Sequence, residues 1–293
     1  MKIQSLSIVV PGGCPNKCRF CVSCLHPNPI PNQIEKNKRF RDLYKKDFQR
    51  RMAFARDNGC NTVMLTGNGE PLINESFLNF FAEWNEKLDN PFRWIEIQTS
   101  GVTLTEEKLR WLRNEIGVSV ISLSLSSVFN SAINAYYNVT PQSLVVDIDA
   151  LCAEIKRYDF DLRLSLNMTD AYNTKTSKEI LERCKSLGAN QVTVRVLYES
   201  EVDDEHGINK WIQQHRASEE VLQSLNDSIV RLGRPLRKLP FGGMLYSLDG
   251  MSIVIDNDCM SQAVKEEDLV KYLILQPNCK LSTRWDDEGS LLF

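Results

Sequence analysis

The sequence predicts an α/β fold, a partial (β/α)6 barrel followed by a β-rich C-terminal extension. Three observations predict it. Six apolar runs of strand type alternate with amphipathic helical stretches, the later strands are apolar on one face and polar on the other, and hairpin patterns replace this alternation near residue 234. A length of 293 residues suits one β/α barrel. We therefore expect a barrel over residues 1–233 and an extension over 234–293.

The βα units follow one another with spacing that suits parallel strands and right-handed crossovers. We expect strands near 3–10, 61–66, 93–99, 118–126, 160–168 and 190–198. We expect helices near 40–58, 74–89, 105–115, 140–157, 174–187 and 217–232. Thr105 with Glu106 and Glu107 gives a helix start, and Gly188 and Gly233 give helix ends.

The sequence predicts two hairpins in the extension. One is expected to turn near Asp249-Gly250 and the other near Pro277-Asn278. The acidic stretch 199–207 is typical of a long loop. The sequence contains no solenoid repeat and no low-complexity segment.

Composition excludes several classes of protein. A hydrophobic share of 42% and a charged share of 25% are typical of a globular domain, and a net charge of −3 argues against bulk nucleic-acid binding. The apolar run at 6–10 is too short for an export signal or a membrane span. Nine cysteines without an export signal suggest reduced thiols, so we expect a cytoplasmic protein with no membrane partner.

Cysteines with CxxxCxxC spacing follow the first expected strand. Cys14, Cys18 and Cys21 come directly after the glycine pair 12–13, on a loop. Three thiolates can hold three corners of an iron–sulfur cube and leave one iron open to a further ligand. The alternative is a zinc site that also uses Cys24. It is less favoured, because four-cysteine zinc sites usually pair two knuckles from separate segments, and Cys24 is expected to be a bystander.

A glycine-rich turn follows the second expected strand. It runs Thr66-Gly67-Asn68-Gly69-Glu70-Pro71, and its glycines let backbone groups approach a ligand that a Cβ would hold off. Taken alone this is a weak signal, because a strand-to-helix turn often holds Gly and Pro for local reasons.

Polar side chains alternate with apolar ones along the third to sixth strands, whereas buried parallel strands are usually apolar on both faces. The polar set includes Glu96, Gln98, Ser122, Ser124, Ser126, Asp161, Arg163, Ser165, Asn167, Thr193 and Arg195. If the apolar set faces the helices, the polar set lines the barrel and calls for a polar ligand. The alternative is an antiparallel sheet with one face in water.

The segment CPNKCRFC, with Phe20 before its last cysteine, resembles the signature of the radical S-adenosylmethionine superfamily. The resemblance implies a TIM-like barrel and one 4Fe-4S cluster on Cys14, Cys18 and Cys21. It also implies S-adenosylmethionine on the open iron, cleaved by one electron to a 5′-deoxyadenosyl radical. The turn at 66–71 resembles the family's GGEP turn, although Asn68 stands where the family often has Gly. The cofactor-binding residues so implied are Phe20, Gly67, Gly69, Glu70, Ser100, Ser124, Ser126, Asn167 and Arg195, the last for the carboxylate.

The resemblance covers about 3–198, and its overall pattern is nearest to the molybdenum-cofactor cyclase-like branch. It implies a small polar substrate, possibly a nucleotide or nucleoside, and a flavodoxin or ferredoxin as electron donor. Two alternatives remain within the enzyme class, a peptide-modifying maturase and an activase of glycyl-radical enzymes. Outside it, the chain could be a non-catalytic metal-binding protein.

The other cysteines predict no second cluster. Cys60, Cys152 and Cys184 are expected to be small buried residues. Cys259 and Cys279 are too few to hold an auxiliary cluster. The basic run at 36–51 is usually a solvated helix face; the alternative is that it guides a phosphate-bearing substrate or an acidic electron donor.

Overall fold

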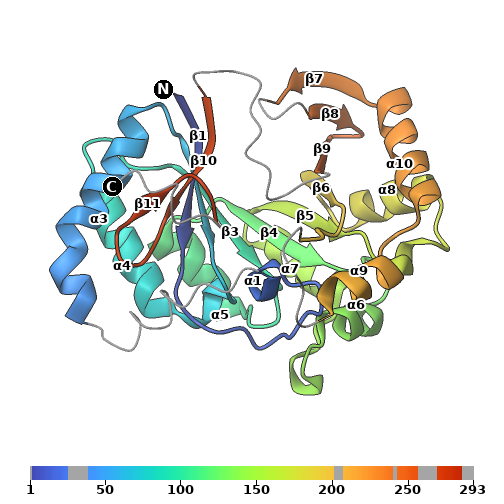
Figure 1. Cartoon of the computed structure of the whole chain (residues 1–293), viewed down its shortest axis with the longest axis horizontal. Coiled ribbons are helices and arrows are strands. Elements are labelled where there is room, and N and C mark those ends of the chain that lie inside the picture. Colours follow the sequence, from blue (N-terminus) through green and yellow to red (C-terminus); the bar gives the residue numbers. More distant parts are fainter. Residues whose placement is uncertain (1, 26–38, 201–206, 240–242, 257–268, 286–293) are drawn as a thin grey trace.

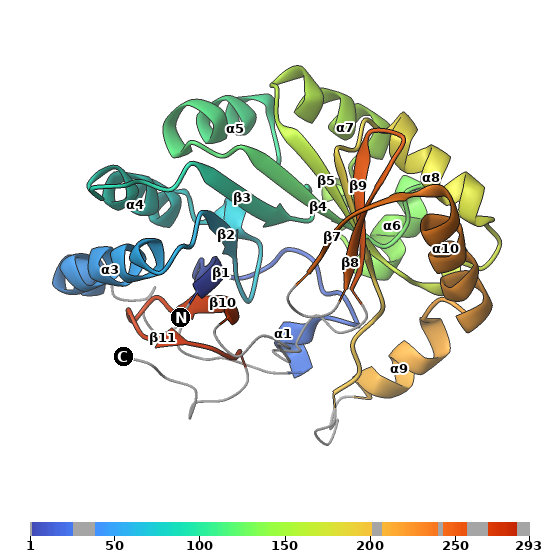
Figure 2. The ribbon, with the colours of Figure 1, turned by 90° about the horizontal axis from the view of Figure 1, so that it is seen from above.

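A computed structural model of the chain describes residues 2–25, 39–200, 207–239, 243–256 and 269–285. Within them one mixed sheet has the strand order β11-β10-β1-β2-β3-β4-β5-β6-β9-β8-β7. From β10 to β9 in this order, all neighbouring strands are parallel. The sheet curves around a central space with helices on its outer side, as Figures 1 and 2 show. This arrangement confirms the partial β/α barrel.

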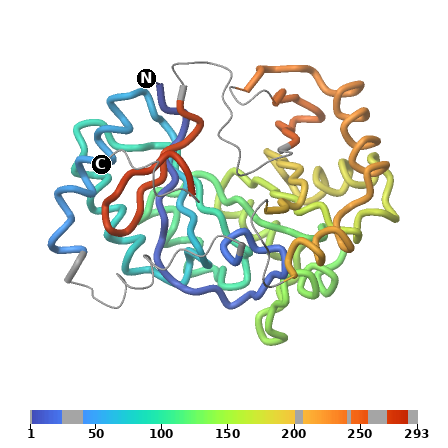
Figure 3. The backbone as a smooth tube through the Cα atoms, in the orientation of Figure 1, coloured from blue at the N-terminus to red at the C-terminus, as the bar shows by residue number. Residues whose placement is uncertain are grey.

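The six barrel strands lie close to their expected positions: β1 Lys2–Val9, β2 Thr62–Thr66, β3 Trp94–Thr99, β4 Val120–Leu125, β5 Asp161–Asn167 and β6 Gln191–Arg195. The main helices are α3 Arg39–Asp57, α4 Glu75–Glu86, α5 Glu106–Trp111, α7 Ile148–Arg157, α8 Ser177–Ser186 and α10 Glu219–Leu232. Shorter elements are α1 Val22–Leu25, η1 Pro71–Ile73, η2 Leu112–Ile116, η3 Gln142–Leu144 and η4 Asp170–Tyr172. The tube in Figure 3 follows the chain through these units.

Three helices differ from the expectation. The helix expected at 140–157 begins only at Ile148, where the Asp147 side chain accepts a hydrogen bond from the Ala150 N–H, and the chain before it forms η3 and extended backbone. The sequence reading missed α6, Ser131–Asn138, and α9, Ile208–His215. Both are short, and α6 carries no charged residue to mark its ends.

Alternation along the strands separates two environments. Leu162, Leu164 and Leu166 of β5 are fully buried in the main apolar core with residues of α7 and α8. Their strand neighbours Arg163 and Ser165 belong to the opposite face. The apolar faces therefore pack on the helices, as the sequence predicts.

The C-terminal extension joins the barrel sheet at both edges. Its strands are β7 Arg234–Lys238, β8 Met244–Leu248, β9 Met251–Asp256, β10 Leu269–Leu275 and β11 Leu281–Ser282. Both hairpins are confirmed: β8 and β9 are antiparallel across Asp249-Gly250, and β10 and β11 are antiparallel across residues 276–280. Because β9 pairs with β6 and β10 pairs with β1, the extension continues the sheet at both edges of the barrel.

The part of the chain that the structure describes contains no helix with both the length and the apolar character needed to cross a bilayer.

Candidate functional site

The cysteine loop leaves the carboxyl end of β1 and is held by the end of α6. The Lys17 N–H donates to the Asn138 carbonyl at 3.2 Å, and the Cys18 thiol lies 3.5 Å from the same oxygen. Cys14 is exposed, while Cys18 and Cys21 are partly buried, and all three are free thiols. Three potential metal ligands thus share one loop at the carboxyl edge of the sheet, the usual active end of β/α barrels.

The three thiols differ in acidity. Desolvation raises the pKa of Cys14 to about 11 and that of Cys18 to about 12. A hydrogen bond from the Cys24 thiol lowers the pKa of Cys21 to about 6. Cys24 thus lies against one of the expected ligands. Metal binding requires the thiolate forms, so a metal bound here would displace these protons.

The glycine-rich turn packs directly on the cysteine loop. A Cβ at Gly69 would lie 2.2 Å from the Gly13 carbonyl oxygen, and one at Gly67 would lie 2.5 Å from the Val10 carbonyl oxygen. The Glu70 N–H donates to the Gly13 carbonyl at 2.9 Å. The turn therefore needs its glycines for close approach to the neighbouring backbone, a reason that the sequence alone does not reveal.

Glu70 connects this turn to the end of β3. One carboxylate oxygen accepts from the Thr99 hydroxyl at 2.6 Å, and the other accepts from the Ser100 N–H at 2.9 Å and the Ser100 hydroxyl at 2.7 Å. The Glu70 residue is only 3% exposed. Glu70 and Ser100, both expected in the cofactor site, are thus bonded to each other.

The remaining expected residues end neighbouring strands. Asn167 donates to the Ser124 hydroxyl at 3.1 Å. Ser126 is completely buried, and its hydroxyl donates to the Asn138 side chain at 2.7 Å, beneath α6. The Nε of Arg195 is buried and has no partner among the described residues. The structure brings Ser124 and Asn167 together and leaves hydrogen-bonding capacity on Arg195.

A cavity of about 560 Å³ fills the interior of the barrel. Thr66, Gly67, Asn68 and Arg195 line it at the carboxyl ends of their strands, and we call these residues the mouth. Further in, polar side chains from β1, β3, β5, β6 and β9 line it, among them Gln4, Ser5, Gln98, Arg163, Gln191, Thr193 and Ser252. The prediction of a polar lumen is confirmed for Gln98, Arg163, Thr193 and Arg195, whereas Ser100, Asn167 and the serines of β4 and its end do not line the cavity. A cavity of this size and polarity suits a small polar ligand.

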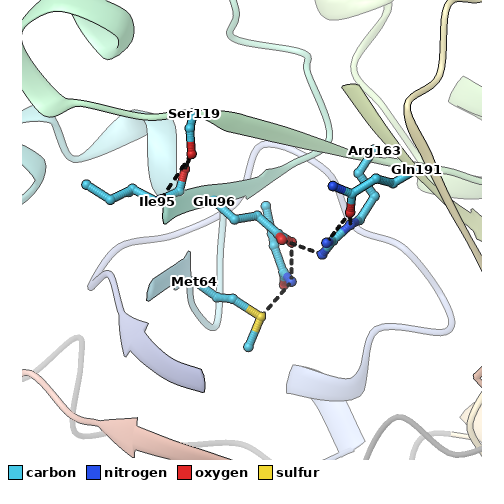
Figure 4. A network of polar contacts seen from close by, with 7 residues as sticks. Met64, Ile95, Glu96, Ser119, Arg163 and Gln191 are labelled. Carbon is cyan, nitrogen blue, oxygen red and sulfur yellow. Dashed lines mark hydrogen bonds and ion pairs between the residues drawn. The ribbon is translucent and has the colours of Figure 1, made fainter. Parts of the chain in front are cut away.

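Buried charge crosses the lumen near the amino ends of the strands (Figure 4). Arg163 forms an ion pair with Glu96, and its Nε donates to Gln191 Oε1 at 2.8 Å. Gln98 donates to Glu96 Oε1 at 3.1 Å and lies 3.8 Å from the Met64 sulfur. We call Glu96, Arg163 and Gln191 the floor. The sequence reading identified the two charges but not Gln191, which the alternation with Thr193 and Arg195 could have indicated.

Phe20, expected to line the cofactor site, contacts a helix that the sequence reading missed. Its ring stacks on Trp211 of α9 at 5.9 Å, against an apolar cluster of Leu197, Ile208 and Ile212. Another unanticipated residue is Asn16, which is 5% exposed, with both side-chain polar atoms unpartnered within the described residues. Asn16 and Phe20 belong to the loop itself, whereas only the tertiary arrangement brings Trp211 to it.

The other cysteines lie apart from the site. Cys60, Cys152 and Cys184 are buried, as expected. Cys279 is also buried, and its thiol lies 3.5 Å from the Tyr44 carbonyl oxygen, whereas Cys259 lies outside the described residues. In the described ranges, no three His, Cys, Asp or Glu side chains are arranged so that they could hold a metal ion as they stand, and this includes Cys14, Cys18 and Cys21, whose thiols would have to move together to bind one. The absence of a second cluster stays a prediction.

The described part of the basic run lies on α3. Lys45 lies 3.9 Å from Asp42, and Arg50 lies 3.4 Å from Asp47, both within the helix. The guanidinium of Arg41 donates to Ser76 at 2.6 Å. These contacts support the interpretation as a solvated helix face.

Comparisons with known proteins agree with a β/α barrel that carries the cysteine loop. The model of the Radical SAM superfamily matches residues 8–206. Streptococcus suis SuiB, solved with S-adenosylmethionine, superposes with a TM-score of 0.56 at 14% identity over 96% of this chain and 58% of its own. Escherichia coli coproporphyrinogen III oxidase (HemN) gives a TM-score of 0.55 at 16% identity over 79% and 52%. The protein anSMEcpe with bound AdoMet gives 0.53 at 16% over 78% and 61%.

These structures share the fold with the chain. The chain spans between about half and six tenths of their lengths. No curated protein matches the chain in sequence.

Proposed function

The chain belongs to the Radical SAM superfamily, and from this premise we propose that it uses one 4Fe-4S cluster and S-adenosylmethionine to abstract hydrogen from a small polar substrate. The observation that carries the proposal is the junction of the cysteine loop and the glycine-rich turn at the mouth of a polar cavity. Three reduced thiols on one loop supply the donor set of such a cluster and leave one iron without a protein ligand.

Cys14, Cys18 and Cys21 would hold the cluster. When bound, the cluster supplies the electron that cleaves S-adenosylmethionine and so generates the hydrogen-abstracting radical. The residues of the protein bind and orient S-adenosylmethionine, and they exclude water from it. Backbone groups of the 67–69 turn receive the amino group of S-adenosylmethionine. Glu70 acts as a positioning residue, because both of its carboxylate oxygens already accept hydrogen bonds from Thr99 or Ser100.

Two further groups fix the rest of the cofactor. Arg195, whose buried Nε has no partner among the residues that the structure describes, pairs with the carboxylate of S-adenosylmethionine. We infer that the Ser124 and Asn167 pair, at the ends of the neighbouring strands β4 and β5, hydrogen-bonds the ribose. The cofactor takes part of the 560 Å³, so the space left suits a small substrate better than a folded protein. A nucleotide or nucleoside, as in the molybdenum-cofactor cyclase-like branch, remains the leading candidate.

Anaerobic reconstitution with iron and sulfide tests the proposal. We expect about four irons per chain and release of 5′-deoxyadenosine with dithionite. Replacing Cys14, Cys18 or Cys21 by Ser should remove the cluster absorbance and lower 5′-deoxyadenosine more than about 100-fold, whereas Cys24→Ser is the matched control and should keep both. If Cys24→Ser loses the metal as fully as the other three, the site is a four-cysteine centre and the proposal fails.

Deuterium transfer then identifies the substrate class. Candidate substrates labelled at carbon are incubated with the reconstituted protein, and the 5′-deoxyadenosine is analysed by mass spectrometry. Transfer from a nucleoside or nucleotide supports the small-molecule proposal. Transfer from a peptide, with none from small molecules, would assign the chain to the peptide-modifying alternative.

A further inference from the structure

The outer face of α6 differs from the rest of the surface in charge. The sequence contains no Asp, Glu, Lys or Arg between Glu115 and Asp147, in a chain in which 25% of residues are charged. Burial explains this for β4, but α6 and the turn after it lie at the surface. Tyr136 is 71% exposed, Ile133 42% and Val139 40%. A surface that lacks charged residues and exposes aromatic and aliphatic side chains is typical of the core of a protein interface.

This neutral face, defined by Ile133, Tyr136 and Val139, lies beside the cysteine loop. Asn138, between Tyr136 and Val139, accepts hydrogen bonds from the Lys17 N–H and the Cys18 thiol through its carbonyl. A chain of ring contacts also leads inward, from Tyr136 to Tyr137 at 5.3 Å, then to Trp211 at 6.2 Å and to Phe20 at 5.9 Å. A protein bound to this face would be separated from Cys18, an expected cluster ligand, by Asn138.

The charged side chains near the neutral face differ between its two ends: exposed Asp147 lies at the start of α6, where the Ile148 N–H donates to the Ser131 hydroxyl, and basic residues lie at the end beside the cysteine loop. Lys17 and Arg19 of the cysteine loop are exposed. Asp170 is engaged by the Tyr137 hydroxyl of α6 and by His215, whose Nδ1 lies 3.4 Å away. At the end beside the cysteine loop, an apolar centre next to two basic groups is complementary to a partner that has an apolar contact surface and acidic side chains at its edge.

We propose that the neutral face of α6 is the docking surface for the electron-donating protein, an acidic carrier with a reduced flavin or iron–sulfur group. This inference rests on the proposed function, which requires an external one-electron reductant. In the step, one electron leaves the donor's reduced group and enters the cluster, the donor is oxidised by one electron, and no bond forms or breaks. Close packing beside the Cys18 ligand keeps the transfer distance short.

The test compares how fast a protein donor and a small chemical reductant each reduce the cluster of the same reconstituted protein. Flavodoxin hydroquinone is the probe donor, dithionite is the small reductant, and the signal of the reduced cluster is followed by electron paramagnetic resonance without substrate. The variant Ile133→Ser/Tyr136→Ser removes the apolar centre. The control Leu232→Ser changes a leucine that is 58% exposed on α10, away from the loop.

We expect the double variant to be reduced by flavodoxin at least about 10-fold more slowly than the wild type, with dithionite reduction unchanged and the control unaffected. Higher ionic strength should slow reduction of the wild type by flavodoxin and leave reduction by dithionite unchanged. A parallel fall with both reductants, or no fall with flavodoxin, overturns the proposal, as does a wild type that accepts electrons from dithionite alone.

Two further outcomes have separate meanings. Loss of self-association in the double variant on size-exclusion chromatography would assign the face to a second copy of the chain and overturn the proposal. A cluster that both reductants reduce without any 5′-deoxyadenosine release would instead contradict the proposed function, while the docking result would stand on the resonance signal.

Discussion

The mouth and the floor of the lumen are both polar, but they use polarity differently. At the floor, Arg163 is engaged by Glu96 and Gln191, so the charges satisfy one another. At the mouth, the Nε of Arg195 is buried without a partner in the described part of the chain. A buried donor that lacks a partner costs about 1–3 kcal/mol. The polar groups of the floor therefore satisfy one another, whereas the mouth retains a donor that is available to a ligand.

Two glycines near the mouth also differ, in the space that surrounds them. Gly69 has no room for a Cβ because the Gly13 carbonyl lies where the Cβ would be, whereas a Cβ at Gly13 itself would have no heavy atom within 4 Å. Space is thus restricted on the turn and open on the loop.

The largest effect is expected from Gly69→Ala. The new methyl group must push the turn away from the cysteine loop, and a displacement of about 1 Å at a reacting centre can cost about 100-fold in rate. We expect a fall of that size in dithionite-driven 5′-deoxyadenosine release. Gly13→Ala is the matched control and should change the rate less than about 3-fold, because its methyl group meets nothing. Equal losses in both variants would show that the contact between turn and loop does not set the geometry.

Much of this comparison could be predicted from the sequence. The period of two along β5, with Leu162 and Leu164 against Arg163 and Ser165, identifies a lumen face because the alternation is local. The contacts of Glu70 could not be predicted. They depend on the tertiary approach of β3 to the turn, for which the residues themselves carry no pattern.

The two missed helices show a second limit. Trp211 on α9 reaches Phe20 only because a distant segment folds back over the cysteine loop, and no periodic signal links residues so far apart. The absence of charge on α6 was visible in the sequence but has meaning only once the helix is known to lie at the surface. Chemistry at strand ends was therefore easier to predict than the elements that cover it.

Glu96→Gln tests whether the charges of the floor depend on each other for stability. The change leaves Arg163 partly buried without its counter-ion, and we expect a loss of about 2 kcal/mol in the free energy of unfolding. This is at the low side for a broken buried pair, because the Arg163 side chain is 27% exposed while that of Glu96 is 3% exposed. Urea unfolding measures it.

The double variant Glu96→Leu/Arg163→Met supplies the control for that prediction. It removes both charges, and we expect it to recover most of the lost stability, because replacing a buried pair by apolar groups is often neutral. A double variant that is less stable than Glu96→Gln would show that the floor contributes more than the pairing of its own charges.

Arg195→Met probes the mouth, and a smaller effect is expected there. Loss of a charge-assisted hydrogen bond to a carboxylate should raise the KM for S-adenosylmethionine about 10-fold, with folding stability unchanged or slightly increased. Arg237→Met is the control, because Arg237 lines the same cavity from β7. If Arg237→Met raises this KM as much as Arg195→Met, the carboxylate is not held specifically at the mouth.

The smallest effect is expected at Val139, which ends α6 with a φ of 48°. A β-branched residue in the left-handed region is strained, and Asn adopts that conformation more readily. Val139→Asn should therefore raise the free energy of unfolding by about 1 kcal/mol, seen as a rise of about 2 °C in Tm. Val230→Asn, at a helical and 50% exposed position on α10, should give no such rise. If Val139→Asn is more stable yet is reduced more slowly by flavodoxin, the strained valine is retained for docking; if it is more stable and equally fast, the neutral face does not extend beyond Tyr136.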